Sequence, residues 1–521
     1  MNGAQALIRT LVASGVDVCF ANPGTSEMHF VAALDAVPEM RGVLGLFEGV
    51  VTGAADGYGR MADKPAATLL HLGSGLGNGL ANLHNARRAR TPIVNIVGDH
   101  ATTHKKYDAP LDSDIETVAR NVSGWLRTSP SPEAVASDAA EAVAAACGPP
   151  GQIATLVLPA DVSWLEAGAP AAPVARDSRR SVSGSAIDEA AAALRSGSPA
   201  ALFVGGSVLR EQGLVAASRV AGATGAKLLA ETFPARLERG AGLPAVDRLG
   251  YLAEFAALQL DGLAHLVLVD AKSPVSFFAY PGKASDLVPE GCQVHVLAAG
   301  SDDAVAALEA LADAVDAPLG GATLAPAVRP EPPTGVLNAQ AVGQALGALL
   351  PDNAIVADEG QTAGLFAAGS TAGAPRHDWL TLCGGAIGMG LPLATGAAIA
   401  CPDRPVVSLE ADGSAMYTLQ ALWTQAREGL DVTTIILANR AYAILDMELD
   451  RVGATGEDGV GPRAAAMLDI SRPELDFVAL AQGMGVPGTR VETAEALVAA
   501  MTEAFAEPGP HLIEAMLPRS L

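Results

Sequence analysis

Residues 405–439 read PVVSLEADGSAMYTLQALWTQAREGLDVTTIILAN, and this stretch decides the fold. Two apolar, β-branched runs, at 406–410 and 432–438, are typical of buried strands. The segment between them, at 415–430, has the apolar spacing of a helix. A strand, a helix and a second strand in this order form the repeating unit of parallel sheets. The stretch therefore predicts an α/β fold.

Two oxygen-bearing side chains stand at the ends of these strands. Asp412 follows the first strand, and Asn439 ends the second one 27 positions later. Ligands of parallel sheets bind at the carboxyl ends of the strands, and oxygen ligands that leave other positions open suit Mg²⁺. Gly413 permits close backbone approach, and Ser414, which opens the helix, can donate to a phosphate. The stretch Asp-Gly-Ser alone could be a turn with a helix cap, but together with the asparagine it predicts a magnesium and phosphate site.

The same alternation of short β-branched runs and Ala-rich helical segments extends along the whole chain of 521 residues. Two Pro/Ala-rich linkers, at 166–185 and 316–335, divide it. We therefore predict three α/β domains with doubly wound parallel sheets, at residues 1–170, 186–315 and 336–521.

Composition excludes several classes of protein. The net charge of −24 opposes binding to nucleic acid, whose affinity depends on neutralising phosphates. No apolar run reaches the roughly 18 residues that cross a membrane, and the N-terminal segment lacks the pattern of a signal peptide. The five cysteines have no paired spacing, which argues against a zinc site or a disulfide framework. We expect a cytoplasmic protein that binds neither membranes nor nucleic acid.

The metal motif resembles that of thiamine diphosphate enzymes of the pyruvate oxidase, acetolactate synthase and benzoylformate decarboxylase family. Their motif is GDG followed, after a helix and a strand, by NN. Here Ala411 and Ala438 replace the first Gly and the first Asn, while Asp412 and Asn439 keep the ligand positions. The resemblance spans nearly the whole chain. The sequence looks most similar to acetolactate synthase large-subunit homologues. It implies a pyrimidine-binding domain, a Rossmann-like middle domain and a diphosphate-binding domain, with the backbone carbonyl of Ala441 as a third metal ligand.

Glu48 is the second signal, in the sequence LGLFEGVVTGAADGYGR. Taken alone, it could be a surface residue where a strand meets a helix. In the resembling family, a glutamate followed by a stretch like AAxGYxR bonds the aminopyrimidine ring of the cofactor. That bond promotes formation of the ylid, which attacks the substrate. The resemblance therefore implies that Glu48 is the cofactor's activator.

The resemblance also implies further cofactor contacts. Gln361 and Thr362 match positions near the diphosphate, and Tyr442 is expected at the same end of the cofactor. Gly385 matches the residue whose carbonyl receives the aminopyrimidine amine. Ile387 matches the aliphatic side chain that holds the cofactor bent.

Two nucleotide cofactors are not expected. The glycines at 73–79 fail the G-x-G-x-x-G spacing because Asn78 stands at the last glycine position, which argues against NAD. Segment 270–278, DAKSPVSFF, replaces the DDRVTG-like segment that helps hold FAD in acetolactate synthases. We therefore do not expect bound flavin.

Residues that decide the reaction outcome are predicted around the cofactor. His71, at a strand end beside an expected Gly-rich loop at 73–79, aligns with a catalytic histidine of benzoylformate decarboxylase, although a histidine at a strand end can also be a core residue. Thr25 and Ser26, in NPGTSE, match the position of that enzyme's catalytic serine. The second histidine of that enzyme has no counterpart here, since the corresponding stretch SPVSFFAYPG contains none.

Four further residues are expected to line the substrate site. His104 and Lys105 lie in a basic segment after the third strand of the first domain, which could equally be a solvated surface. Phe278 lies in SPVSFFAYPG, and Leu445 follows the metal turn.

Together these residues predict an enzyme that uses thiamine diphosphate and Mg²⁺ to decarboxylate or carboligate a 2-oxo acid without oxidation, through an ylid and an enamine. The alternatives are acetolactate synthase, which joins two pyruvates, and a catalytically silent paralogue that regulates one. In the family the cofactor lies between two subunits. A homodimer is then the minimum active unit, and a homotetramer is the commoner assembly.

Overall fold

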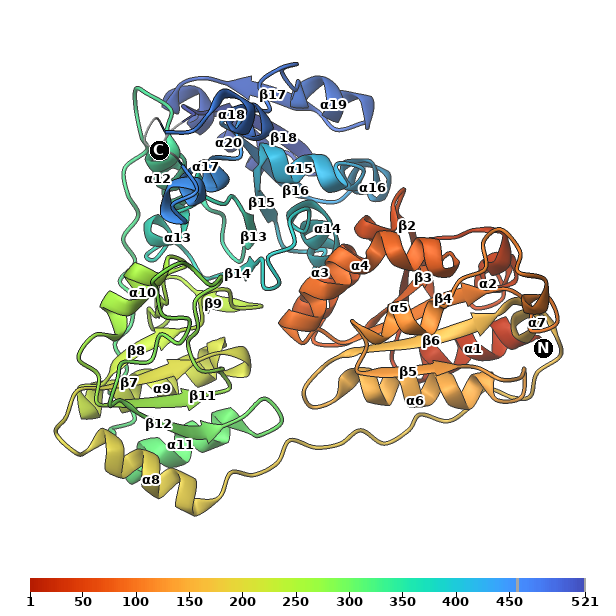
Figure 1. Ribbon diagram of the computed structural model, residues 1–521, viewed down its shortest axis with the longest axis horizontal. Helices are drawn as coiled ribbons and strands as arrows, with labels where there is room; N and C mark the ends of the chain where they lie inside the picture. Colours follow the sequence, from red (N-terminus) through yellow and green to blue (C-terminus); the bar gives the residue numbers. More distant parts are fainter. Residues whose placement is uncertain (456–458, 520–521) are drawn as a thin grey trace.

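Three parallel β-sheets, each flanked by helices, make up the computed structural model, which describes residues 1–455 and 459–519 (Figure 1). The first sheet has the strand order β2-β1-β3-β4-β6-β5, with all neighbours parallel. Its strands are β1 (Val18–Asn22), β2 (Arg41–Leu44), β3 (Ala66–Leu70), β4 (Ile93–Asp99), β5 (Trp125–Thr128) and β6 (Ile153–Pro159). Its helices are α1 (Gly3–Ala13), α2 (Met28–Leu34), α3 (Glu48–Ala62), α4 (Leu72–Ala89), α5 (Ile115–Arg120), α6 (Val135–Cys147) and α7 (Ala160–Trp164), with short 3₁₀ turns η1 (Thr25–Glu27) and η2 (Lys105–Tyr107). Separate apolar clusters cover its two faces, as a doubly wound sheet requires.

The second sheet has the order β10-β8-β7-β11-β12. Its strands are β7 (Ala200–Val204), β8 (Lys227–Ala230), β10 (Asp247–Arg248), β11 (His265–Val269) and β12 (Gln293–Ala298). The surrounding helices are α8 (Gly184–Leu194), α9 (Glu211–Thr224), α10 (Ala253–Leu260) and α11 (Ala304–Ala314), with the 3₁₀ turn η3 (Gly206–Leu209). An extended linker leads to α8 from the first sheet (Figure 1).

The third sheet has the order β17-β18-β16-β15-β13-β14-β9. Its parallel strands are β13 (Ile355–Glu359), β14 (His377–Thr381), β15 (Val406–Ala411), β16 (Val432–Ala438), β17 (Gly488–Val491) and β18 (His511–Met516). Its helices are α12 (Ala339–Leu349), α13 (Ala367–Ser370), α14 (Gly390–Ala400), α15 (Asp412–Thr418), α16 (Ala421–Glu428), α17 (Ala443–Arg451), α18 (Pro462–Leu468), α19 (Phe477–Gly483) and α20 (Ala494–Ala506). The predicted α/β class with three parallel sheets is confirmed.

One strand of the third sheet was not expected. β9 (Leu237–Arg239) comes from the middle part of the chain and pairs antiparallel with β14. The buried side chain of Leu237 lies opposite Trp379, the largest fully buried side chain of the described residues. The middle part of the chain thus completes the edge of the third sheet.

Two local predictions differ from the structure. The helix expected at 415–430 is two helices, α15 and α16, separated by Leu419 and Gln420. Both residues accept i+3 hydrogen bonds of the 3₁₀ type, which tighten the chain at this point. The glycines at 73–79 belong to α4 and form no loop. They bring α4 close to α3, since a Cβ at Gly79 would lie 2.9 Å from a methyl group of Thr52.

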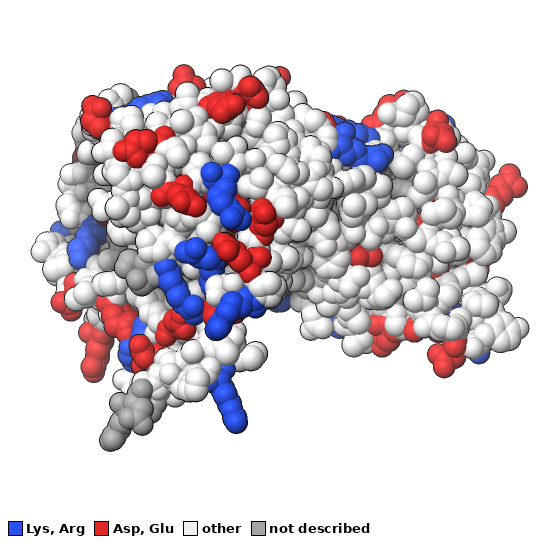
Figure 2. Space-filling view, turned by 90° about the horizontal axis from the view of Figure 1, so that it is seen from above, with Lys and Arg blue, Asp and Glu red and all other residues white. Residues whose placement is uncertain are grey.

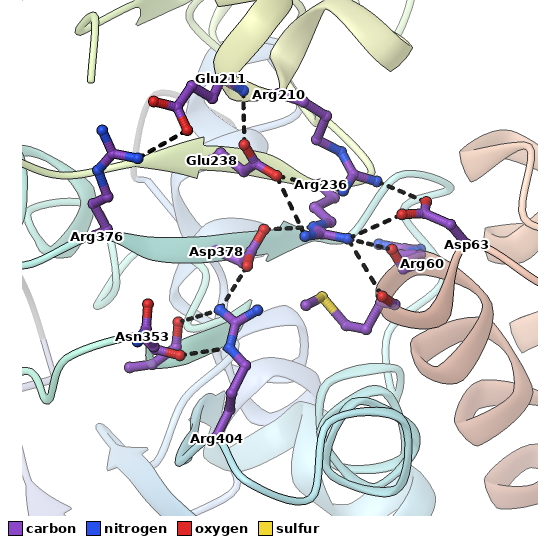
Figure 3. A network of polar contacts seen from close by, with 12 residues as sticks. Arg60, Asp63, Arg210, Glu211, Arg236, Glu238, Asn353, Arg376, Asp378 and Arg404 are labelled. Atoms are coloured by element: carbon purple, nitrogen blue, oxygen red, sulfur yellow. Dashed lines mark hydrogen bonds and ion pairs between the residues drawn. The ribbon is translucent and has the colours of Figure 1, made fainter. Parts of the chain in front are cut away.

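A network of arginines and carboxylates joins the three parts of the chain (Figure 3). Asp378, on β14, accepts hydrogen bonds from Arg236 and, at 2.6 Å, from Arg404. Arg236 also donates to the backbone carbonyl of Arg60, on α3, at 3.2 Å. Arg60 is itself buried against Asp56 and donates to the Thr381 carbonyl at 2.8 Å. The network fixes α3 against the third sheet.

None of the described helices is long and apolar enough to cross a membrane. On the face shown in Figure 2, basic and acidic side chains are intermixed and much of the surface carries no charge.

The network predicts that two of its carboxylates, Asp378 and Asp63, contribute unequally to the free energy of unfolding. The Asp378 side chain is 5% exposed, whereas Asp63, a second partner of Arg236, is 70% exposed. We expect Asp378→Ala to destabilise the protein by about 3 kcal/mol, because two guanidinium groups lose their shared buried carboxylate. Asp63→Ala should cost less than about 1 kcal/mol. Urea unfolding followed by near-UV circular dichroism measures both, and equal losses would contradict this reading of the network.

Candidate functional site

Asp412 begins α15 directly after β15, at the carboxyl edge of the third sheet. Its Oδ1 accepts a hydrogen bond from the Gly413 N–H at 2.8 Å, and its Oδ2 accepts one from the Arg440 N–H at 2.5 Å. The side chain is buried. Burial raises the pKa of Asp412, while the N–H groups of Arg440 and Gly413 act in the opposite direction. The carboxylate is thus fixed in place by backbone donors.

Asn439 follows β16, the neighbour of β15, so its side chain reaches the same edge. Its Oδ1 accepts a hydrogen bond from the Ala441 N–H at 3.1 Å. Arg440 between them has a φ of +58°, which turns the chain sharply. A carboxylate and an amide oxygen therefore lie at one edge of the sheet, beside the backbone of Ala441. These hard oxygen donors fit Mg²⁺.

Tyr442 closes this end of the site. Its ring packs against Gly413, where any side chain would collide with it. Burial raises the pKa of Tyr442, and the neighbouring Tyr417 and Asp412 raise it further. Ser414 is buried in the first turn of α15, whose N-terminal N–H groups favour an anion.

Gln361 and Thr362 lie just past the carboxyl end of β13, which is adjacent to β15. Gln361 has a φ of +50°, and the turn is tight because Gly364 donates to the Gly360 carbonyl at 2.9 Å. The turn therefore reaches the same sheet edge as Asp412.

The turn at 384–390 connects β14 to α14 and is held from α4. His84 Nε2 lies 3.1 Å from the Gly384 carbonyl oxygen, and Asn85 donates to the Ala386 carbonyl at 2.8 Å. Asn82 donates to the Gly388 carbonyl at 3.2 Å. Gly385, with a φ of +74°, lies between the first two of these carbonyls.

Glu359, the last residue of β13 in the third sheet, holds the same turn. Glu359 accepts hydrogen bonds from the Gly388 N–H at 2.8 Å and the Gly390 N–H at 2.5 Å. Burial raises the pKa of Glu359. The pKa of Glu410 is also raised, by burial and by the charge of Glu359 beside it. Glu359 thus supports the turn, and the carboxyl group of Glu410 lies buried beside it.

Gly385 and Ile387, both on this turn, differ in exposure. Gly385 is exposed except where the ring of Phe277 packs on it, and a Cβ at Gly385 would lie 2.7 Å from that ring. Ile387 is half-buried against the core between α3 and α14.

Glu48 is the first residue of α3 and is 6% exposed. Its Oε2 accepts a hydrogen bond from the Asn78 side chain, on α4, at 3.0 Å. Its Oε1 faces Gly75, where a Cβ would lie 3.0 Å away. One oxygen of a buried carboxylate is therefore engaged, while the other lies beside a glycine.

His71 caps α4 and forms a pair that was not predicted. Its Nδ1 lies 2.8 Å from Oε2 of Glu27, which is fully buried and also accepts the Gly24 N–H at 2.7 Å. Burial raises the pKa of Glu27, while the interaction with His71 lowers it. Thr25 and Ser26 belong to the same 3₁₀ turn as Glu27, with Thr25 exposed and Ser26 half-buried.

The four residues expected in the substrate site differ in exposure and in charge pairing. His104 is exposed, and Lys105 is paired with Asp99 at 2.5 Å, so its charge is already partnered. Phe278 and Leu445 are 55% and 46% exposed.

The structure links the two groups of predicted residues through the turn at 384–390. The Gly388 carbonyl accepts from Asn82 of α4 and, at 2.9 Å, from Thr418 of α15. No hydrogen bond within the described residues joins Glu48 directly to Asp412. One chain thus contributes two clusters that are connected through the backbone of this turn. The Glu48 cluster contains Glu48, Asn78, His71 and Glu27. The Asp412 cluster contains Asp412, Asn439, Ala441 and Tyr442.

Sequence reasoning missed six residues that hold this site together: Glu27, Asn78, Asn82, His84, Asn85 and Glu359. The amides at 82 and 85 stand on one face of a helix among apolar residues, and this spacing was the available signal. Glu27 follows Gly24 by three positions, as in a capping arrangement, but nothing local points to His71.

The nucleotide crevice of the middle sheet is filled by the chain itself. It lies between β7 and β11, where strand order reverses and dinucleotides bind in related folds. Asp270 accepts the N–H and the hydroxyl of Ser207, both at 2.9 Å, and Glu231 accepts the Gly206 N–H at 3.1 Å. Arg90 pairs with Asp270 at 2.5 Å. Donors that could hold a phosphate are taken by carboxylates, so these residues do not fit a flavin nucleotide.

Two models of the thiamine pyrophosphate (thiamine diphosphate) enzymes match the chain. The N-terminal TPP binding domain matches residues 1–119, and the C-terminal TPP binding domain matches residues 358–515. These ranges contain the Glu48 and Asp412 clusters.

Whole-length relatives agree. A Mycobacterium tuberculosis protein provisionally named acetolactate synthase large subunit IlvX is 61% identical over 99% of both chains. Benzoylformate decarboxylase of Pseudomonas aeruginosa is 29% identical over 96% of both. The structure of a thiamine diphosphate-dependent 4-hydroxybenzoylformate decarboxylase from Rhodococcus jostii RHA1 superposes with a TM-score of 0.86 at 26% identity, covering 99% of both chains. The chain belongs to the family of thiamine pyrophosphate enzymes.

Proposed function

We propose that this protein uses thiamine diphosphate and Mg²⁺ to decarboxylate a 2-oxo acid without oxidation, or to join it to an aldehyde acceptor. The observation that carries the proposal is Glu48, a buried carboxylate with one oxygen held by Asn78 and the other beside Gly75. Burying a carboxylate costs free energy, and its retention in an oriented state therefore favours a functional role. When bound, thiamine diphosphate supplies the carbon nucleophile and the electron sink for the 2-oxo acid.

Asp412, Asn439 and the Ala441 carbonyl would hold the metal, and the α15 N-terminus with Ser414 would hold the diphosphate. Their gathering at one sheet edge supports this assignment. Gln361 and Thr362 would contribute from the adjacent strand end.

Two proton-handling groups serve the site. Glu48 presents Oε1 for proton exchange, because Asn78 occupies Oε2. His71 is held by Glu27 through Nδ1, which leaves Nε2 to give or take a proton. Thr25 and Ser26 would add hydroxyl donors beside it.

The substrate side chain is proposed to be aromatic. Five aromatic rings form one cluster, which reaches the site where Phe277 packs on Gly385: Phe233, Tyr251, Phe277, Phe278 and Tyr280. Within it, the Phe277 ring lies 5.0–5.7 Å from three neighbouring rings and packs on Gly385. Arg451, on α17, lies 4.9 Å from the Tyr280 ring, and α17 begins just after the metal turn. The rings thus extend between the two proposed ends of the cofactor site, where they favour an aryl group over a methyl group.

Acetolactate synthesis is the alternative favoured by the name of the Mycobacterium tuberculosis relative. The aromatic cluster and the filled crevice of the middle sheet weigh against it. A silent regulatory paralogue is disfavoured by retention of Glu48. We further propose a cytoplasmic homodimer as the minimum unit and a homotetramer as the full assembly, since no hydrogen bond within the described residues joins Glu48 to Asp412 in one chain.

The Glu48→Gln substitution tests the proposal that the protein is an enzyme that depends on Glu48. We expect turnover of the best 2-oxo acid to fall by about 100-fold or more, since the amide cannot exchange a proton. CO₂ release measures the rate. Glu39→Gln, at an exposed glutamate of the same domain, serves as the control and should keep full activity. Unchanged turnover in Glu48→Gln would make the enzyme reading wrong.

Metal removal tests the assignment of Asp412. Treatment with a chelator should abolish activity and release thiamine diphosphate, and added Mg²⁺ should restore both. Asp412→Asn should raise the Mg²⁺ concentration needed for half-maximal activity by at least about tenfold, because an anionic ligand is lost. Activity that survives chelation would contradict the magnesium site.

A substrate panel tests the aromatic preference. We expect kcat/KM for benzoylformate to exceed that for pyruvate by about tenfold or more. Phe277→Ala should reduce this ratio, whereas Phe255→Ala, at an exposed phenylalanine outside the cluster, should not. Stoichiometric acetolactate from pyruvate would instead establish the alternative.

A further inference from the structure

We propose that Asn82 and Asn85 of α4 are positioning residues that set the turn at 384–390 in register with the start of α3. The inference rests on the proposed function, because it concerns two elements that the proposed dimer would use to bind its cofactors: the turn that carries Gly385 and the start of α3 that carries Glu48. Neither residue is placed in contact with cofactor or substrate.

Asn82 joins two backbone segments that are far apart in sequence. Its Nδ2 donates to the Gly49 carbonyl at 2.8 Å and to the Gly388 carbonyl at 3.2 Å. Gly49 follows Glu48, and Gly388 belongs to the turn that carries Gly385. The side chain is buried, so both bonds are shielded from water.

Asn85 fixes the orientation of Asn82. Its Nδ2 donates to Oδ1 of Asn82 at 3.0 Å. That oxygen is therefore an acceptor, and the amino group of Asn82 must face the two carbonyls. Asn85 also donates to the Ala386 carbonyl at 2.8 Å and accepts the Ala386 N–H at 3.2 Å. Ala386 is therefore held at both its N–H and its carbonyl, which fixes the two peptide units that flank it.

Glycines provide the space for these amides. At Gly53 a Cβ would lie 2.9 Å from Nδ2 of Asn82, and at Gly384 a Cβ would collide with Oδ1 of Asn85. The contact needs close approach of α3, α4 and the turn, so small shifts of one element reach the others.

The bonds explain how the Gly385 carbonyl can be aimed. The carbonyls of Gly384 and Ala386 are held by α4, and Gly388 is held by Asn82 and Glu359 from opposite sides. Gly385 thus lies in a backbone with fixed neighbours. Losing the amides would release this turn and the first residues of α3 together, although Glu48 itself would keep its bond to Asn78.

The experiment compares Asn82→Ala and Asn85→Ala with Asn95→Ala in the full-length protein. Asn95 is the matched control: it is fully buried in the same domain but bonds only Thr68 and Thr155 within the sheet. Asn82→Ser, which keeps a polar group and admits water, guards against misfolding of the alanine variant. Two properties are measured besides thermal stability: the Kd of thiamine diphosphate at fixed Mg²⁺, by titration of apo-protein, and the exchange of the cofactor's C2 proton with deuterium, by quenched NMR.

We expect Asn82→Ala and Asn82→Ser to slow C2-proton exchange by about 10- to 100-fold, the scale on which small misplacements act. Asn85→Ala should raise the Kd of thiamine diphosphate by about tenfold, since second-layer contacts of cofactor and metal sites act on this scale. Asn95→Ala should lose thermal stability while both cofactor properties stay unchanged.

Two outcomes overturn the inference in different ways. If the Asn82 variants lose only thermal stability, as Asn95→Ala does, the amides are merely structural and this inference is wrong while the proposed function stands. If the unmodified protein neither binds thiamine diphosphate nor accelerates its C2-proton exchange, the proposed function fails and this inference fails with it.

Discussion

The polar backbone of residues 384–390 is the constraint on which the arrangement of the chain depends. A bent segment between a strand and a helix cannot satisfy its own N–H and C=O groups, and leaving them unpaired in the interior is costly. Here the N–H groups of Gly388 and Gly390 are satisfied by Glu359, and carbonyls on either side of Gly385 by the α4 side chains. The first and third sheets must therefore dock in one register to bury this turn at all. The arginine network of Figure 3 reinforces the same docking from the middle of the chain.

Buried carboxylates recur throughout the site, and each is matched to donors of a different kind. Asp412 is held by two backbone N–H groups, Glu48 by an amide and Glu27 by a histidine and a backbone N–H. A carboxylate that accepts one hydrogen bond at each oxygen keeps further lone pairs, with which it could bind a cation. A histidine partner instead makes a pair in which a proton can be moved. The same side-chain chemistry can thus serve metal binding in one place and proton transfer in another, because the partners differ.

The sequence was most informative where structure is local. Asp412 and Asn439 could be placed at neighbouring strand ends because strand ends follow from apolar patterns and turn residues over a few positions. The contacts of Asn82 with Gly388 span 306 positions, and no local pattern encodes such a pairing. The same holds for β9, whose place is fixed by packing on Trp379, and for the glycines at 73–79, which were read as a loop. Glycine in a helix lowers its intrinsic stability, but packing against α3 overrides that preference.

The middle part of the chain shows how a shared fold can be given a different role. Its sheet keeps the strand order of a nucleotide-binding domain, yet Asp270 and Glu231 occupy the backbone donors of the crevice. Burial raises the pKa of Glu231 to about 7, which leaves it partly neutral and lowers the cost of two carboxyl groups in one crevice. Arg90, at the end of α4, provides the compensating charge for Asp270. The crevice thus binds the first domain where a related fold would bind a phosphate, and the segment after β11 is free to turn Phe277 toward Gly385. An architecture that related folds use for cofactor binding is here used for interdomain contact and for shaping the site.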